Sequence, residues 1–330
     1  GRDLFSSTVI PNRGAWLEYE TDQSEVLYVR IDKNRKIPLS TFVRSLGMFV
    51  CVANDPRAFK FDIDGKDAKM LENIRQLVAD SVYINSDASF AEMTNEHMRQ
   101  LFGNDERFGY TLEKDATKTV DEALLEVYKK LRPGEPLSVD SAESLIRGMF
   151  FDPRRYDLAK VGRYKFNKKL ALKNRIKNFT LAESVVDMTT GEIIAEEGTF
   201  ITEEIANQIQ NSAAPYVFVQ TEERVVKVLS NMMVDLDSFV DFDPEEVGVS
   251  EKVFYPVLRT ILEENETEED IKDAIRKNIN ELIPMHITKE DIFASINYNI
   301  HLEYGIGNDD DIDHLRNRRS RAVAELLQNQ

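Results

Sequence analysis

The sequence predicts an α+β fold in which a mixed lobe of helices and antiparallel strands carries a small β-containing insertion. Three observations predict this class: strand-forming alternation in the first fifty residues, helical spacing of apolar residues between positions 67 and 150, and short strand patterns after Asn178. The chain has 330 residues, of which 42% are hydrophobic, so it can bury sizeable cores. This length corresponds to about two domains.

The first fifty residues predict a β-hairpin and then a short helix. Residues 15–20 alternate between apolar and polar side chains, and residues 26–31 are rich in strand formers after a polar break. Residues 41–46 predict a helix that ends at Gly47.

Helices are predicted to dominate between residues 67 and 152. Apolar residues recur at helical spacing over 70–78, 124–131 and 145–150, and Ser141 opens the last of these helices. Beyond Asn178 the pattern predicts a small β unit over 185–201, a short helix capped by Thr202, strands over 217–219 and 224–229, an acidic loop or linker over 235–246, a helix over 267–282, and a further helix from Thr288.

Several classes of protein and site are excluded. The sequence has no run of about 18 apolar residues, the length that a membrane-spanning helix needs. The single cysteine, Cys51, rules out an internal disulfide framework and fits a reducing cytoplasm. The sequence has no phosphate-binding glycine loop, no nucleophile elbow, no Cys-x-x-Cys pair and no histidine spacing typical of zinc ligands, so we expect no metal site. Residues 62–65 imitate part of a calcium loop, but Lys60 and Leu71 occupy its first and twelfth ligand positions.

One dense group of carboxylates lies at residues 308–313. Asp309, Asp311 and Asp313 could hold Mg²⁺ for phosphoryl transfer, or they could form a solvated loop after a glycine turn. Four arginines follow directly and would neutralise the acids or reach a nucleic acid beside them: Arg316, Arg318, Arg319 and Arg321.

Charge is distributed unevenly along the chain. The net charge is −17, but residues 147–177, here called the basic segment, carry +9 and leave −26 for the rest. Tyr156, Tyr164 and Phe166 interrupt its cations, which suits a groove that tracks a nucleic-acid backbone. The alternative is a solvated face whose aromatic residues lie in the core.

A second group of cations lies beside the only tryptophan, Trp16. Its members are Arg30, Lys33, Arg35 and Lys36. The indole could stack on a nucleic-acid base, although a lone tryptophan more often belongs to the core.

Together these segments resemble the beta subunit of bacterial RNA polymerase, in a Firmicutes-like form. The matching blocks run in family order from the first residues to the last: 9–18, 28–32, 131–136, 155–158, 161–165, 187–198, 310–315 and 325–330. Because the chain also begins at Gly1 rather than Met, we expect it to be a piece from the N-terminal half of such a subunit, chiefly its lobe domain.

The resemblance implies a domain organisation and a role. The lobe core would comprise residues 1–177 and 285–315, the insertion 178–284, and residues 316–330 would lead to a neighbouring domain. The lobe would form one jaw of the DNA cleft and hold the non-template strand and the downstream duplex. The chain would take part in nucleotidyl transfer only within the polymerase, with no catalytic centre or cofactor of its own, since another subunit holds the Mg²⁺. Its partners would be DNA, the other subunits, a sigma factor and transcription factors in the bacterial cytoplasm, at the nucleoid and not at a membrane.

The resemblance also assigns site residues. Trp16 would stack on a non-template base, and Ile312, Asp313 and Arg318 would line a pocket that reads a guanine. Arg163 would contact the strand backbone. The remaining candidate cations for DNA phosphates are Arg30, Lys33, Arg35, Lys165 and Lys168.

Some positions depart from the family pattern. Arg316 stands where glycine is usual, and an arginine would be strained there if the backbone required a positive φ. Asn299 and His301 are more polar than expected for their helix.

Two alternatives of different class stay open. In one, the acidic faces dock a basic transcription factor or a sigma-type subunit. In the other, Asp309, Asp311 and Asp313 form a separate magnesium-dependent enzyme.

Overall fold

A computed structural model describes residues 4–49, 93–187, 190–311, 313–318 and 323–328. Its α+β class is the predicted one: helices alternate with several small antiparallel sheets. The predicted helix over 70–78, the rejected calcium loop, Cys51 and Ile312 lie outside the described residues.

The N-terminal sheet has four antiparallel strands in the order β1-β2-β3-β4: Ser6–Val9, Leu17–Thr21, Leu27–Ile31 and Ile37–Pro38. The predicted hairpin is confirmed as β2 and β3, which pair Leu17 with Ile31 and Thr21 with Leu27. Alternate residues of both strands are buried, as the sequence pattern requires for a sheet with one face in a core.

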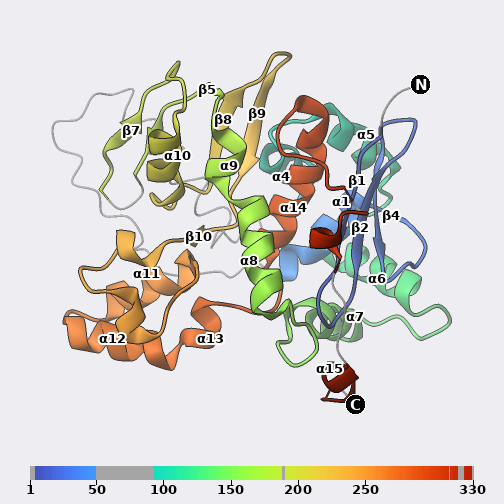
Figure 1. The fold of residues 1–330 in the computed structure, drawn as a ribbon. Coiled ribbons are helices and arrows are strands. Elements are labelled where there is room, and N and C mark those ends of the chain that lie inside the picture. The colour runs from blue at the N-terminus through green and yellow to red at the C-terminus, as the bar shows by residue number, and fades with distance from the viewer. Residues whose placement is uncertain (1–3, 50–92, 188–189, 312, 319–322, 329–330) are drawn as a thin grey trace.

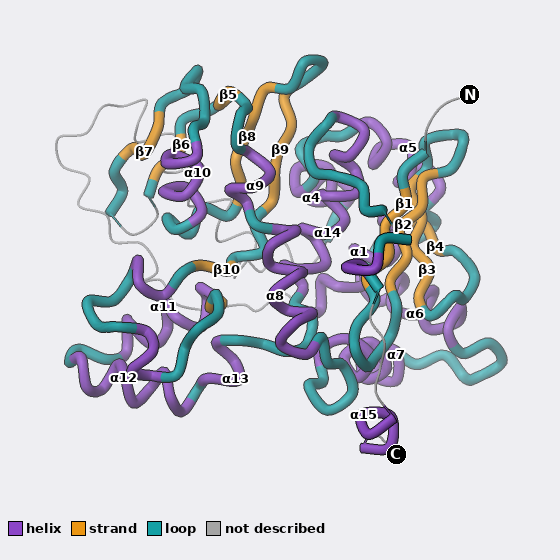
Figure 2. The backbone as a smooth tube through the Cα atoms, in the orientation of Figure 1, coloured by secondary structure: helices purple, strands orange, loops and turns teal. Residues whose placement is uncertain are grey.

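Helices cover the buried face of this sheet and complete the main core, as Figures 1 and 2 show. They are α1 (Leu39–Ser45) with its 3-10 extension (Leu46–Phe49), α4 (Asn95–Leu101), α5 (Glu106–Lys114), α6 (Val120–Leu131), α7 (Val139–Ile146) with a π turn (Arg147–Phe151), and α14 (Lys289–His301). The apolar spacing over 124–131 correctly predicted α6, which starts at the cap Thr119.

The basic segment ends in two helices, α8 (Ala159–Leu170) and α9 (Leu172–Ile176). In Figure 1, α8 and α14 lie at the centre, between the N-terminal sheet and the remaining elements.

A second core forms where the sequence predicted a β unit. It contains the sheet β5-β8-β9 (Thr180–Leu181, Tyr216–Gln220 and Val225–Leu229), the hairpin β6-β7 (Val185–Val186 and Ile193–Ala195), and α10 (Glu203–Gln210), which Thr202 caps as predicted.

A third core lies below the second in the view of Figure 1. Its elements are β10 (Met233–Val234), β11 (Val253–Phe254), α11 (Tyr255–Glu264), α12 (Glu268–Lys277), α13 (Ile279–Leu282) and the 3-10 turns Leu236–Ser238 and Pro244–Val247. Residues 235–246 form an irregular loop with 3-10 turns, which is one of the two predicted alternatives, and this loop is packed rather than a free linker because Leu236 and Phe242 are buried in this core. The prediction of one continuous helix was wrong here. The helix over 267–282 is interrupted at Asn278, whose side chain donates a hydrogen bond to the Ala274 carbonyl.

The chain ends in 3-10 turns at Leu302–Tyr304 and Leu315–Asn317 and in α15 (Val323–Gln328). The boundaries of the predicted lobe and insertion stay a prediction.

Candidate nucleic-acid interface

Trp16 lies at the end of the β2-β3 hairpin and is half-buried. Its backbone is held twice by Asp32: the Trp16 N–H donates to Asp32 Oδ1 at 2.7 Å, and the Asp32 N–H donates to the Trp16 carbonyl at 3.1 Å. Lys33 Nζ lies 5.0 Å from the centroid of the indole ring. The predicted pairing of an aromatic residue with a cation is therefore present at this turn.

The other cations of this group differ in their availability. Arg30 Nε donates to Glu20 Oε1 at 2.7 Å, and this hydrogen bond raises the pKa of the Arg30 guanidinium. Arg35 is exposed on the loop between β3 and β4. Lys36 Nζ lies 4.1 Å from the Tyr28 ring centroid. Arg35 is thus more open to an anion than Arg30, which already has a carboxylate partner.

The basic segment divides between surface and core. Tyr164, Lys165 and Lys168 are exposed on α8, and the Tyr164 side chain is 54% exposed. Tyr156 is fully buried in the main core, and Phe166 is half-buried against it. Around Tyr164 the aromatic residue and the cations are exposed together, as a nucleic-acid groove requires, whereas Tyr156 lies in the core, as the alternative interpretation requires.

Arg163 is not a surface residue, which corrects its assignment to a DNA backbone. Its side chain is completely buried and pairs with Asp291 at 2.9 Å between Nη1 and Oδ2. It also donates to the carbonyls of Pro284 at 2.8 Å and His286 at 2.7 Å. Each nitrogen of the guanidinium therefore donates to an internal acceptor, and the buried side chain has no path to a phosphate in this structure.

The carboxylate group at residues 308–313 contacts the basic segment through Lys169. Lys169 Nζ lies 2.7 Å from Asp310 Oδ1 and donates to the Asn308 carbonyl at 2.9 Å. Asp311 Oδ1 accepts from the Asp313 N–H at 3.1 Å, which shapes a turn. The described residues contain no group of three or more His, Cys, Asp or Glu side chains arranged to hold a metal ion.

Asp313 and Arg318 are exposed on either side of the 3-10 turn Leu315–Asn317. Arg316 lies within that turn, whose right-handed backbone suits an arginine. The expected strain at this position is therefore absent.

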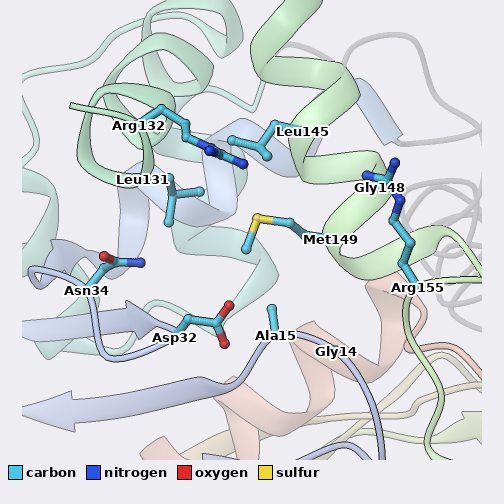
Figure 3. A pocket seen from close by; sticks show the side chains of 10 residues that line it. All are labelled: Gly14, Ala15, Asp32, Asn34, Leu131, Arg132, Leu145, Gly148, Met149 and Arg155. Atoms are coloured by element: carbon cyan, nitrogen blue, oxygen red, sulfur yellow. The ribbon is translucent and has the colours of Figure 1, made fainter. Parts of the chain in front are cut away.

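A pocket of about 430 Å³ is lined by Ala15 and Asp32, the chain neighbour and the hydrogen-bond partner of Trp16, and the sequence did not predict it. Figure 3 shows Arg132 and Arg155 on opposite sides of the pocket, with Arg155 alongside Gly148 and with the Asp32 carboxylate and the Met149 thioether directed inward. The remaining lining residues are Gly14, Asn34, Leu131 and Leu145. The Arg-Pro-Gly turn at 132–134 was the only sequence feature noted near the pocket. The hairpin and α7 reach this turn through tertiary packing, which the sequence does not show.

Comparison with known proteins identifies the family. The model of RNA polymerase Rpb2, domain 2, matches residues 96–196 and 243–321. The chain belongs to this RNA polymerase family. Three similar proteins carry the name DNA-directed RNA polymerase subunit beta: those of Clostridium acetobutylicum, Clostridium novyi and Acetivibrio thermocellus are 48%, 49% and 50% identical to this chain over its whole length.

The chain spans 23% of the length of these relatives, and the beta-subunit family predicted from the sequence is confirmed. Two of these relatives are from Clostridium species, in agreement with the predicted Firmicutes-like form. No helix among the described residues is long and apolar enough to cross a membrane.

Proposed function

We propose that this chain is the lobe region of a bacterial RNA polymerase β subunit and holds the non-template strand beside the DNA cleft. The observation that carries the proposal is the turn where Trp16 and Lys33 meet, because an aromatic ring with an adjacent cation offers stacking to a base and charge to its phosphate. The exposed residues Arg35, Lys165 and Lys168 add cations of the kind that track a nucleic-acid backbone.

A guanine pocket forms the second part of the proposal. The Asp313 carboxylate accepts hydrogen bonds and the Arg318 guanidinium donates them, which matches the edges of guanine. Both side chains are exposed beside the same turn, so a base can reach them.

In the assembled enzyme the partners would be the other polymerase subunits, a sigma factor, transcription factors and both forms of DNA, in the cytoplasm at the nucleoid. The Mg²⁺ of nucleotidyl transfer would belong to another subunit, so this chain contributes binding and no catalytic group.

A titration of the chain with forked DNA that carries a single-stranded segment tests the strand-holding role. Lys168→Glu is expected to weaken binding and to lower the slope of log K against log salt by about 1, as for one lost phosphate contact. The matched control is Lys277→Glu, which makes the same charge change at an exposed position of α12. Equal effects of the two variants would exclude a local contact at α8 and favour a docking role for this surface.

The same titration tests base reading. Asp313→Ala is expected to remove the preference for guanine over adenine at the double-strand edge while it leaves the salt slope unchanged. A guanine preference that persists in Asp313→Ala contradicts the assignment of this carboxylate.

A further inference from the structure

Two consecutive residues with a left-handed backbone form the turn after β3. Asp32 and Lys33 have φ values of 50° and 61°, and the Asn34 N–H donates to the Ile31 carbonyl at 3.0 Å. Such a turn favours Asn, Asp or Gly, so lysine at its second central position is costly. Backbone strain of this kind is retained where the surrounding structure uses it.

The turn holds Trp16 in place. The two hydrogen bonds between Asp32 and the Trp16 backbone fix the residue immediately before β2. Lys33, the second left-handed residue of the turn, has its Nζ 5.0 Å from the indole centroid. Asp32 and Ala15, the residue before Trp16, also line the pocket. The Asp32 carboxylate is therefore a principal polar restraint on the Trp16 backbone.

We infer that Asp32 is a positioning residue for Trp16, holding the indole as a preorganised stacking platform for a single-stranded nucleic-acid base. This inference rests on the proposed function and adds Asp32 to it, although its carboxylate has the same negative charge as a DNA phosphate. A carboxylate close to a phosphate path repels the strand, so its presence there is explained by its hydrogen bonds and not by attraction.

Fluorescence of the free chain provides the first test, because Trp16 is its only tryptophan. Asp32→Gly keeps the left-handed turn but loses the side-chain acceptor, and Asp32→Asn keeps an oxygen acceptor without the charge. Asp32→Gly is expected to lower the anisotropy of Trp16 and increase its quenching by acrylamide, while Asp32→Asn matches the parent. Trp16→Phe supplies the tyrosine background. Unchanged Trp16 anisotropy in Asp32→Gly overturns the inference.

Binding of a fluorescein-labelled single-stranded oligonucleotide provides the second test, whose sign is decisive. Positioning predicts that Asp32→Gly binds about fivefold more weakly, as for the loss of one hydrogen bond, even though a repulsive charge has been removed. Asp32→Asn should bind at least as tightly as the parent. If the carboxylate acts only through charge, both variants bind more tightly by the same factor, and the inference fails.

The two tests separate the inference from the proposed function. A parent chain that does not bind the oligonucleotide contradicts the strand-holding role, while the fluorescence of Asp32→Gly and Asp32→Asn still decides whether Asp32 positions Trp16.

Discussion

Arg163 shows how one residue of a basic segment can serve the core instead of a ligand. Its guanidinium joins α8 to Asp291 of α14 and to two carbonyls of the intervening chain. Asp291 also accepts from Asn231 Nδ2 at 3.0 Å, so three distant segments meet at one buried pair. Loss of one member of such a pair leaves a buried charge without compensation.

Arg163→Glu is therefore expected to lower the free energy of unfolding by about 3–5 kcal/mol, measured by urea denaturation. Lys165→Glu, at an exposed position of the same helix, is the matched control and is expected to change it by less than about 0.5 kcal/mol. An Arg163→Glu chain that unfolds at the parent's urea midpoint but binds DNA less tightly would restore the surface role rejected here.

His301 links stability to pH. Burial, together with the charge of Arg175, lowers the pKa of His301 to about 3 from its ordinary value of 6.5. Between these values His301 is protonated in the unfolded chain but neutral in the folded chain. The contribution of neutral His301 to stability is therefore complete above pH 6.5 and is lost as the pH falls.

We expect the unfolding free energy of the parent, relative to His301→Gln, to decrease below pH 6.5 by at most about 1.4 kcal/mol per pH unit. Comparison at each pH cancels the contributions of other titrating groups. His314→Gln, at an exposed histidine, should follow the parent. A constant difference between parent and His301→Gln across pH 4–7 would show that His301 does not titrate in this way.

At the scale of elements, α14 is buried along all thirteen of its residues. Its apolar side chains enter the main core, while its polar side chains bond to other segments: Ser295 to Tyr19 at 2.9 Å and Asn299 to Ser7 at 2.6 Å. Asn297 accepts from Arg175 at 2.5 Å and from the Leu229 N–H at 2.9 Å. Of the two polar residues that were unexpected in this helix, Asn299 therefore connects it to β1, whereas Nδ1 of His301 is buried without a hydrogen bond among the described residues.

Asn297→Ala is expected to cost about 2–4 kcal/mol, because it leaves a buried guanidinium and a backbone N–H without this acceptor. Asn299→Ala is the matched control with an expected cost near 1 kcal/mol, since its partner Ser7 is half-buried. Thermal or urea unfolding measures both. Equal costs would mean that Asn297 contributes no more than an ordinary hydrogen bond.

Elements with strong local signals were predictable. The β2-β3 hairpin and α6 have clear periodicity, and Thr202 and Thr288 mark helix starts through capping. The break at Asn278 was not predictable, because apolar spacing continues across it and the interruption follows from packing in the third core.

The candidate site was predictable only in part, for the same reason. Trp16 and Lys33 lie close in sequence to one hairpin, so their meeting followed from the strand pattern. The burial of Arg163 depends on Asp291, 128 residues away, and local composition holds no sign of that contact. The pocket lined by Ala15 and Asp32 likewise joins segments that are far apart in the chain.

At the scale of the whole molecule, the described residues form three large hydrophobic cores, and a small fourth cluster of Leu170, Ala294 and Tyr298 joins α8 to α14 at the centre of Figure 1. The main core uses the N-terminal sheet and α14, whereas the third core draws only on residues 213–285. Such an arrangement allows local opening of one core while the others stay closed.

Hydrogen exchange followed by mass spectrometry tests this independence. Leu258→Ala, in the third core, is expected to cost about 2–5 kcal/mol locally and to reduce protection mainly over 232–285. Ile296→Ala, in α14, should reduce protection in the N-terminal sheet as well. A uniform loss of protection in Leu258→Ala would show instead that the three cores unfold as one unit.

The position of α14 in the chain has a consequence for biosynthesis. Ser7 and Tyr19 are bonded to residues 292 and 276 positions later, so β1 and β2 are completed by a helix that is synthesised long after them. Until then Arg163 has no Asp291, and the part of the main core that α14 fills is open. A nascent chain of this kind exposes surface that chaperones recognise until α14 has been synthesised.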